Sequence, residues 1–221
     1  MCGRFVLFSD LKQIQRAFDL DDATLQLEQS YNISPTHQIA TVVQRADAKL
    51  LETMRWGLIP AWAKDPEIGA RMINARAETV AEKPSFKHAF VKRRCIVIAD
   101  GFYEWRKAET QKTPMFIRLK SEAPIGFAGL YETWQPPKGQ AITSCTIITT
   151  SANELMQPIH DRMPVILPQE LQRVWLDPTN QDANKLVALL KPYPAKEMLA
   201  YAVSPLVNSP RNNSVECIKP V

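Results

Sequence analysis

The chain has 221 residues and a formal net charge of +4, and 45% of its residues are hydrophobic and 23% charged. These values are ordinary for a soluble globular protein that buries its core without disulfides or structural metals. They exclude the strongly basic class of dedicated nucleic-acid binders, and no run approaches the roughly 20 apolar residues of a membrane span.

Apolar periodicity predicts a first helix immediately after Ser9, which is a good N-cap residue. Leu11, Ile14 and Phe18 then fall on one face of that helix. Before residue 95, the pattern predicts two further extended segments and one short helix, at residues 38–44, 49–58 and 85–90.

Between residues 95 and 150 the chain is rich in strand-like runs separated by polar or proline-containing turns, namely CIVIA, GFYEW, MFIRL, IGFAGLYETW and SCTIITT. Helical patterns follow at residues 152–157, 169–176 and 182–190. In the last of these, Asp182 is a possible N-cap, and Leu186, Val187 and Leu190 are expected to face the core. The tail from residue 203 is expected to be extended.

Strand runs followed by segregated helices favour an α+β fold over a doubly wound sheet. Because the chain shows no internal repeat and no low-complexity linker, we expect a single domain that covers residues 1–221. No apolar stretch typical of a signal peptide follows the first charged residues, so we expect a cytoplasmic protein.

The four cysteines, Cys2, Cys95, Cys145 and Cys217, are widely spaced and form no CxxC pair. Neither a zinc site nor a redox pair is therefore expected, and no metal or organic cofactor is required. Cys95 and Cys145 lie inside strand-like runs, which is typical of buried and unreactive thiols.

Cys2 is different, because it directly follows the initiator Met1. A small residue at position 2 generally permits removal of the initiator methionine, and the mature chain would then begin with an amine and a thiol on adjacent carbons. Their reference pKa values, about 7.7–8.0 and about 8.5, leave reactive populations of both near neutral pH. Such a pair condenses with an aldehyde to a Schiff base and then closes a thiazolidine ring.

Two other interpretations of this N-terminus remain open. An amidohydrolase of the N-terminal-nucleophile class also begins with Cys-Gly and uses the amine as a base for the thiol, but the Gly-Asp and Asn-Gly turns of glutaminase domains are missing here. Alternatively, Cys2 stands there by chance, and the protein is a non-catalytic binder of single-stranded DNA.

Six segments in fixed order resemble the SRAP (SOS-response-associated peptidase) family, whose members shield abasic sites: MCGRF, YNISPT, RWGLIPAWAK, INARAET, ADGFYEW and IHDRMPVIL. VNSPRNN at residues 207–213 resembles the C-terminal stretch of the family. The resemblance implies a curved, barrel-like sheet with short helices around it. It also implies a thiazolidine cross-link between mature Cys2 and an abasic site in single-stranded DNA, a self-processing peptidase activity and a lyase-type side reaction.

The resemblance assigns catalytic roles to Asn74, Glu104 and His160 beside Cys2. An amide such as that of Asn74 both donates and accepts hydrogen bonds, which suits holding an amine and a sugar hydroxyl. Glu104 lies among aromatic residues in GFYEW, where desolvation is expected to raise its pKa and suit it to proton transfer. Asp161 follows His160 and is placed to orient an imidazole that assists opening of the sugar ring.

Arginines adjoin three of the candidate catalytic residues, at Arg4, Arg76 and Arg162. Guanidinium groups at these places are expected to hold DNA phosphates without reading sequence. Trp62 is a candidate for stacking on an exposed base. Arg93 and Arg94 are weaker DNA-binding candidates, because a basic pair is usually a solvated surface. We expect a monomer with no membrane partner.

Overall fold

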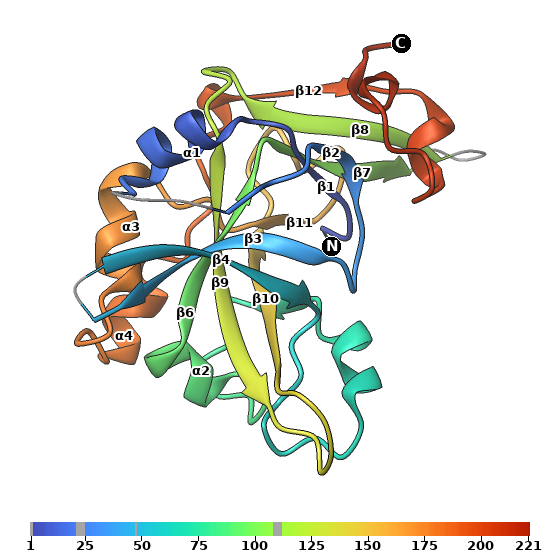
Figure 1. Ribbon diagram of the computed structural model, residues 1–221. Coiled ribbons are helices and arrows are strands. Elements are labelled where there is room, and N and C mark those ends of the chain that lie inside the picture. The colour runs from blue at the N-terminus through green and yellow to red at the C-terminus, as the bar shows by residue number, and fades with distance from the viewer. Residues whose placement is uncertain (1, 21–24, 47, 108–111) are drawn as a thin grey trace.

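The computed structural model describes residues 2–20, 25–46, 48–107 and 112–221, and Figure 1 shows how their elements are arranged. The strands are β1 (Phe5–Leu7), β2 (Ser30–Ile33), β3 (Gln38–Arg45), β4 (Ala48–Trp56), β5 (Asn74–Arg76), β6 (Arg94–Ala99), β7 (Gly101–Lys107), β8 (Lys112–Leu119), β9 (Ile125–Trp134), β10 (Ile142–Ser151), β11 (Arg162–Pro164) and β12 (Met198–Ala202). The α-helices are α1 (Leu11–Phe18), α2 (Lys87–Lys92), α3 (Gln169–Leu176) and α4 (Ala183–Val187), and the 3-10 helices are η1 (Pro66–Arg71), η2 (Ala195–Glu197), η3 (Pro205–Asn208) and η4 (Val215–Ile218).

One sheet closes on itself. Strands β10, β4, β3, β6 and β9 are neighbours in that order, and β9 also pairs with β10, so the pairing returns to its start. Gly129 on β9 makes this closure possible, because a Cβ atom there would lie only 2.9 Å from Cys95 Sγ and 3.1 Å from Thr146 O. The predicted α+β fold with a curved, barrel-like sheet is confirmed.

A second sheet has the strand order β12-β8-β7-β1-β2 and is antiparallel in its pairings. Its strand β1 lies between β7 and β2 (Figure 1). Asp100 fixes the end of β1, because its carboxylate accepts hydrogen bonds from the backbone N–H groups of Phe8 and Ser9 (2.7 Å for Ser9). The N-terminal segment is therefore held firmly in the sheet.

The structure corrects the predicted start of the first helix. Its N-cap is Asp10, which forms a capping box with Gln13, whereas the hydroxyl of Ser9 donates to Asp100. Ser9 and Asp10 are adjacent and both are good N-cap residues, so the sequence alone does not decide between them. In the structure Ser9 is bonded to the buried carboxylate of Asp100, which leaves Asp10 to cap the helix.

Three expectations for the C-terminal half were also wrong. Residues 152–157 form a loop and turns rather than a helix, and the backbone N–H of Met156 donates to both the side-chain and the carbonyl oxygen of Asn153. Val187 is exposed, since α4 ends there, while Leu186 and Leu190 are buried as predicted. The tail contains the 3-10 helices η3 and η4 instead of a continuous extended segment.

Cys95 and Cys145 are fully buried, as their positions in strand-like runs predicted. Among the residues that the structure describes, no helix has both the length and the apolar character that crossing a bilayer demands.

Arg94 is buried and binds backbone carbonyl groups at the ends of two helices. Its guanidinium donates to five backbone carbonyl oxygens at the ends of α2 and α3 and in the turn that follows, namely those of Phe90, Val91, Trp175, Asp177 and Asn180. Burial lowers the pKa of Arg94 to about 10, so the group stays charged at neutral pH. Cations at helix C-termini are favourable, and these carbonyls would otherwise be left without donors.

We therefore expect Arg94→Lys to lower the free energy of unfolding by about 2–3 kcal/mol, because an ammonium group cannot reach all five oxygens. Urea unfolding followed by circular dichroism measures this decrease. The matched control is Arg93→Lys, since Arg93 pairs with Glu132 through one nitrogen, a contact that an ammonium group can also make. Equal decreases in the two variants would contradict the assignment.

Candidate active site at the N-terminus

Cys2 is fully buried where the two sheets meet. It leads into β1 of the second sheet, while the side chain of Asn74, on β5, donates from Nδ2 to the carbonyl oxygen of Cys2 at 2.8 Å. Strand β5 pairs in parallel with β10 of the closed sheet, with Asn74 opposite Ile147. The amide of Asn74 thus ties the start of the chain to the sheet that it does not belong to.

Glu104 reaches the same place from β7, the neighbour of β1. The antiparallel register pairs Phe5 with Phe102, and its continuation sets Gly3 opposite Glu104. As predicted, Phe102 packs in the main core with Cys2, whereas Tyr103 and Trp105 pack on the other face of the strand. Strand alternation therefore turns Glu104 toward the N-terminal cysteine.

Burial controls the protonation of both groups. Glu104 is 3% exposed, and desolvation raises its pKa above the ordinary value, as expected. The pKa of the Cys2 thiol is also raised far above its usual range, first by burial and then by the charge of Glu104. The reference pKa values predicted a reactive thiolate population near neutral pH, whereas burial beside a carboxylate favours the protonated thiol.

His160 lies just before β11 and completes the cluster. Its charge is felt by Glu104, whose pKa it lowers against the larger effect of desolvation. The backbone N–H of Arg162 donates to His160 Nδ1 at 3.0 Å, which favours the neutral tautomer that carries its proton on Nε2. Asp161 Oδ1 lies 2.9 Å from the same nitrogen and would accept its proton when the ring is cationic. The residues predicted to be catalytic are thus brought together.

The candidate DNA-binding residues have different surroundings. Arg4 is partly buried, and its Nη1 donates to Asn32 Oδ1 at 2.6 Å and to Val207 O at 2.9 Å. Arg76 is exposed on β5, two residues after Asn74. Trp62 is 59% exposed, which leaves its ring open to solvent. Arg76 and Trp62 are therefore the more accessible of the candidates.

Arg162 is held by protein groups. Its Nη1 and Nη2 donate to the two carboxylate oxygens of Glu78 at 2.6 and 2.9 Å, and Nη2 also donates to Thr149 O at 2.6 Å. The side chain of Arg162 is only 14% exposed. Its guanidinium is thus already occupied by an internal anion.

Two residues that the sequence analysis passed over have central positions. Asn32 donates from Nδ2 to three carbonyl oxygens of the C-terminal segment, those of Val207, Ser209 and Asn212. Glu78 forms the ion pair with Arg162. Asn32 lies in the segment YNISPT and Glu78 in the segment INARAET. Their position as polar residues inside these segments is the feature of the sequence that could have identified them.

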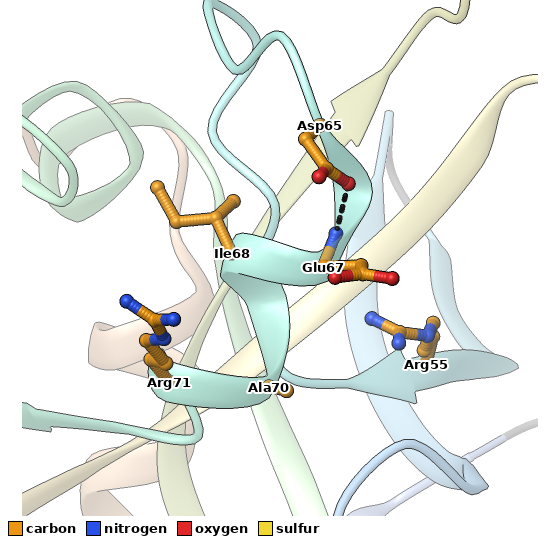
Figure 2. Close-up of a pocket in the computed structure, with 6 residues that line it drawn as sticks. All are labelled: Arg55, Asp65, Glu67, Ile68, Ala70 and Arg71. Atoms are coloured by element: carbon orange, nitrogen blue, oxygen red, sulfur yellow. Dashed lines mark hydrogen bonds between the residues drawn. The ribbon is translucent and has the colours of Figure 1, made fainter.

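A pocket of about 480 Å³ lies apart from this cluster, beside η1, with Asp65 capping that helix through the N–H of Glu67. In Figure 2, Arg55 and Arg71 extend on opposite sides of η1, so their charges do not converge. None of the predicted site residues lines this pocket.

Comparison with known proteins finds a matching family model, similar sequences and a similar structure. The family model described as SOS response associated peptidase (SRAP) matches residues 1–210. The chain is 52% identical to the abasic site processing protein YoqW of Bacillus subtilis, over 99% of each chain. It is 36% identical to the abasic site processing protein HMCES of Xenopus tropicalis, over 86% of this chain and 65% of the relative. A crystal structure of a Bacteroides thetaiotaomicron protein matches all of both chains, with a TM-score of 0.90 and 28% identity.

Proposed function

The chain belongs to the SOS response associated peptidase (SRAP) family, and from this premise we propose that it responds to DNA damage by capturing abasic sites through a processed Cys2. The relatives named as abasic site processing proteins support the DNA substrate. The observation that carries the chemistry is the position of Cys2, buried against Glu104 and held at its carbonyl by Asn74.

The proposed reaction has three balanced steps. The sugar hemiacetal of the abasic site opens to an aldehyde. The free amine of Cys2 then adds to the carbonyl carbon, and loss of one water leaves a C=N bond. Finally, the thiol sulfur bonds to that carbon while its proton passes to the nitrogen, which closes the thiazolidine ring. The net change is loss of one water, and no oxidant or cofactor is consumed.

Each neighbouring group has a role in these steps. Asn74 holds the N-terminal residue and the sugar. Glu104, with a pKa raised by desolvation, moves protons to the departing hydroxyl and from the thiol. His160 assists opening of the sugar ring. A low-dielectric site strengthens these interactions, because water does not compete for the reacting groups.

Arg76 is proposed to bind phosphates, Arg4 and Arg162 to contribute through the N–H donors that their internal contacts leave, and Trp62 to stack on a base. A single strand is the favoured substrate, since the sugar of an intact duplex is harder to reach. Met1 lies outside the described residues. We propose that it is removed by an aminopeptidase or by the protein's own peptidase activity. We also propose a lyase-type side reaction, in which the DNA strand breaks through the imine. The protein is proposed to be monomeric, cytoplasmic and of one domain.

The decisive experiment mixes protein whose Met1 has been removed with a single-stranded oligonucleotide that carries one abasic site. Denaturing electrophoresis is expected to show a covalent adduct, and intact mass spectrometry is expected to give the summed mass of both partners minus one water. An oligonucleotide with a tetrahydrofuran in place of the abasic sugar has no aldehyde and is the matched control. Absence of the adduct refutes the proposal, and release of ammonia from glutamine would favour the amidohydrolase instead.

Arg76→Ala is expected to weaken DNA binding and to reduce the slope of log K against log salt by about 0.7 for each phosphate that Arg76 neutralises. The exposed position of Arg76 on β5, two residues from Asn74, is the basis of this prediction. Fluorescence anisotropy at several salt concentrations provides the measurement. Arg16→Ala, at an exposed arginine on α1, is the control and should leave the slope unchanged. Parallel slopes for Arg76→Ala and the wild type would remove Arg76 from the interface.

A further inference from the structure

We propose that Glu78 is a positioning residue for the proposed reaction and acts on His160 through Arg162. The inference rests on the proposed function, because it concerns the imidazole of the same site. It starts from the anchoring of Arg162, whose guanidinium contacts two segments that are far apart in sequence. One is Glu78, two residues after β5, and the other is Thr149, on β10.

The same residue sets the imidazole. Arg162 is the first residue of β11 and lies opposite Ser151 on β10, and its backbone N–H donates to His160 Nδ1 at 3.0 Å. Strand β11 is only three residues long, so its first peptide is held by few backbone pairs. The side-chain anchor to Glu78 and Thr149 therefore fixes the amide that occupies the Nδ1 lone pair.

The contact between Arg162 and Glu78 is an ion pair at neutral pH. The hydrogen bond from Arg162 is the main cause that lowers the pKa of Glu78, and Arg76 adds to the effect, so the carboxylate is ionised at neutral pH. A bidentate pair between a planar guanidinium and a carboxylate fixes direction as well as distance. Glutamine at position 78 would keep one acceptor but turn an amide donor toward the guanidinium, which breaks the bidentate pairing.

The consequence concerns which ring nitrogen carries the proton. While the amide of Arg162 occupies Nδ1, the neutral ring presents an Nε2–H donor. Among the residues that the structure describes, the charged groups that interact with the ring include Asp161, beside Nδ1, and Glu104, which interacts with it electrostatically. When Arg162 shifts, Asp161 draws the proton to Nδ1, and the population that presents Nε2–H to the sugar falls.

The test compares Glu78→Gln with the matched control Glu52→Gln in processed, full-length protein. Glu52 forms an equivalent bidentate pair with Arg45, at 3.1 and 3.0 Å, on strands that carry none of the proposed site residues. Nitrogen-15 NMR of the histidine rings reports the tautomer directly, and the chain has 3 histidines to assign. Single-turnover cross-linking at saturating DNA and DNA affinity are measured on the same samples.

Glu78→Gln is expected to move the His160 ring resonances from the Nε2–H pattern toward a mixture. It should also slow cross-linking by about 10-fold, a fraction of the roughly 10²-fold that a 1 Å misplacement costs. DNA affinity should not fall, because a negative charge near the phosphates has been removed. Glu78→Asp, which keeps the charge, should restore part of the rate, whereas Glu52→Gln should match the wild type in all three measurements.

Unchanged His160 resonances in a folded Glu78→Gln protein would overturn the proposal. A variant that bound DNA more tightly and reacted faster would also overturn it, and would identify Glu78 as a competitor of phosphate for Arg162. The NMR result needs no abasic DNA. If the wild type itself formed no adduct, the proposed function would fail, while the coupling of Glu78 to the ring would still be decided.

Discussion

Cys2→Ser is expected to convert a heat-stable DNA adduct into one that survives only after reduction with borohydride. Serine keeps the N-terminal amine, so an imine still forms. Its oxygen closes an oxazolidine ring, which hydrolyses far more readily than a thiazolidine. Heating before electrophoresis should therefore remove almost all of the serine adduct and leave the cysteine adduct intact. Borohydride treatment before heating should recover the serine adduct.

The control for this prediction is another buried thiol. Cys217 is fully buried, and its Sγ lies 3.6 Å from Asn212 O, so Cys217→Ser changes the same atom in a different environment. That variant should cross-link as the wild type does. A heat-stable adduct in Cys2→Ser would show that the Cys2 thiol does not close the ring, and loss of the adduct in Cys217→Ser would show that the effect is not specific to Cys2.

Glu104→Gln is expected to slow cross-linking by about 10²–10⁴-fold, the usual contribution of a general acid–base group. The wild-type rate should fall as the pH drops through the Glu104 pKa, which desolvation raises above the ordinary range, because the carboxylate is the form that accepts protons. Glutamine cannot titrate, so the part of the acid limb that Glu104 causes should disappear and only the part due to protonation of the Cys2 amine should remain. Single-turnover rates from about pH 4 to about pH 9 provide the measurement.

The same variant should be more stable than the wild type at neutral pH. A carboxyl group with a raised pKa in the folded state penalises folding when ionised, and the penalty vanishes as the pH falls from the raised pKa to the ordinary one. Each kcal/mol of relief corresponds to roughly 2–4 °C in Tm for a chain of this size. The stabilisation in Glu104→Gln should accordingly disappear in acid.

Glu132→Gln is the matched control, because Glu132 is also a buried carboxylate but accepts an ion pair from Arg93. Removing that charge should lower Tm at neutral pH and leave the cross-linking rate unchanged. A Glu104→Gln protein with wild-type rates at every pH would remove Glu104 from proton transfer. A lower Tm for Glu104→Gln at neutral pH would contradict its desolvation.

Arg4, in the segment MCGRF that resembles the family, has a structural role within the fold. It was predicted to bind phosphate, and the structure shows it linked to Asn32, whose amide donates to three carbonyl oxygens of the C-terminal segment. The first, second and last of the quoted segments are therefore joined by hydrogen bonds. A contact to DNA by Arg4 stays a prediction, and it would have to use the donors that Asn32 and Val207 leave.

The sequence by itself determined the strand runs, the α+β class and the chemistry available at Cys2. The alternation of apolar residues that predicts a strand is a local property of the sequence. The amine and the thiol of an N-terminal cysteine also belong to a single residue, so the chemistry available to them does not depend on the fold. For the same reason, the alternating faces of GFYEW correctly placed Glu104 with Phe102.

Only the tertiary structure decided which groups meet. Arg162 reaches Glu78 across 84 residues of sequence because β5, β10 and β11 pair in one sheet. Asn74, on the same sheet, reaches Cys2 across 72 residues because the start of the other sheet lies against it. Period-2 patterns say which way a side chain points but not which strand lies beside it. The raised pKa of the Cys2 thiol has the same origin, since desolvation depends on the neighbours that the fold brings together.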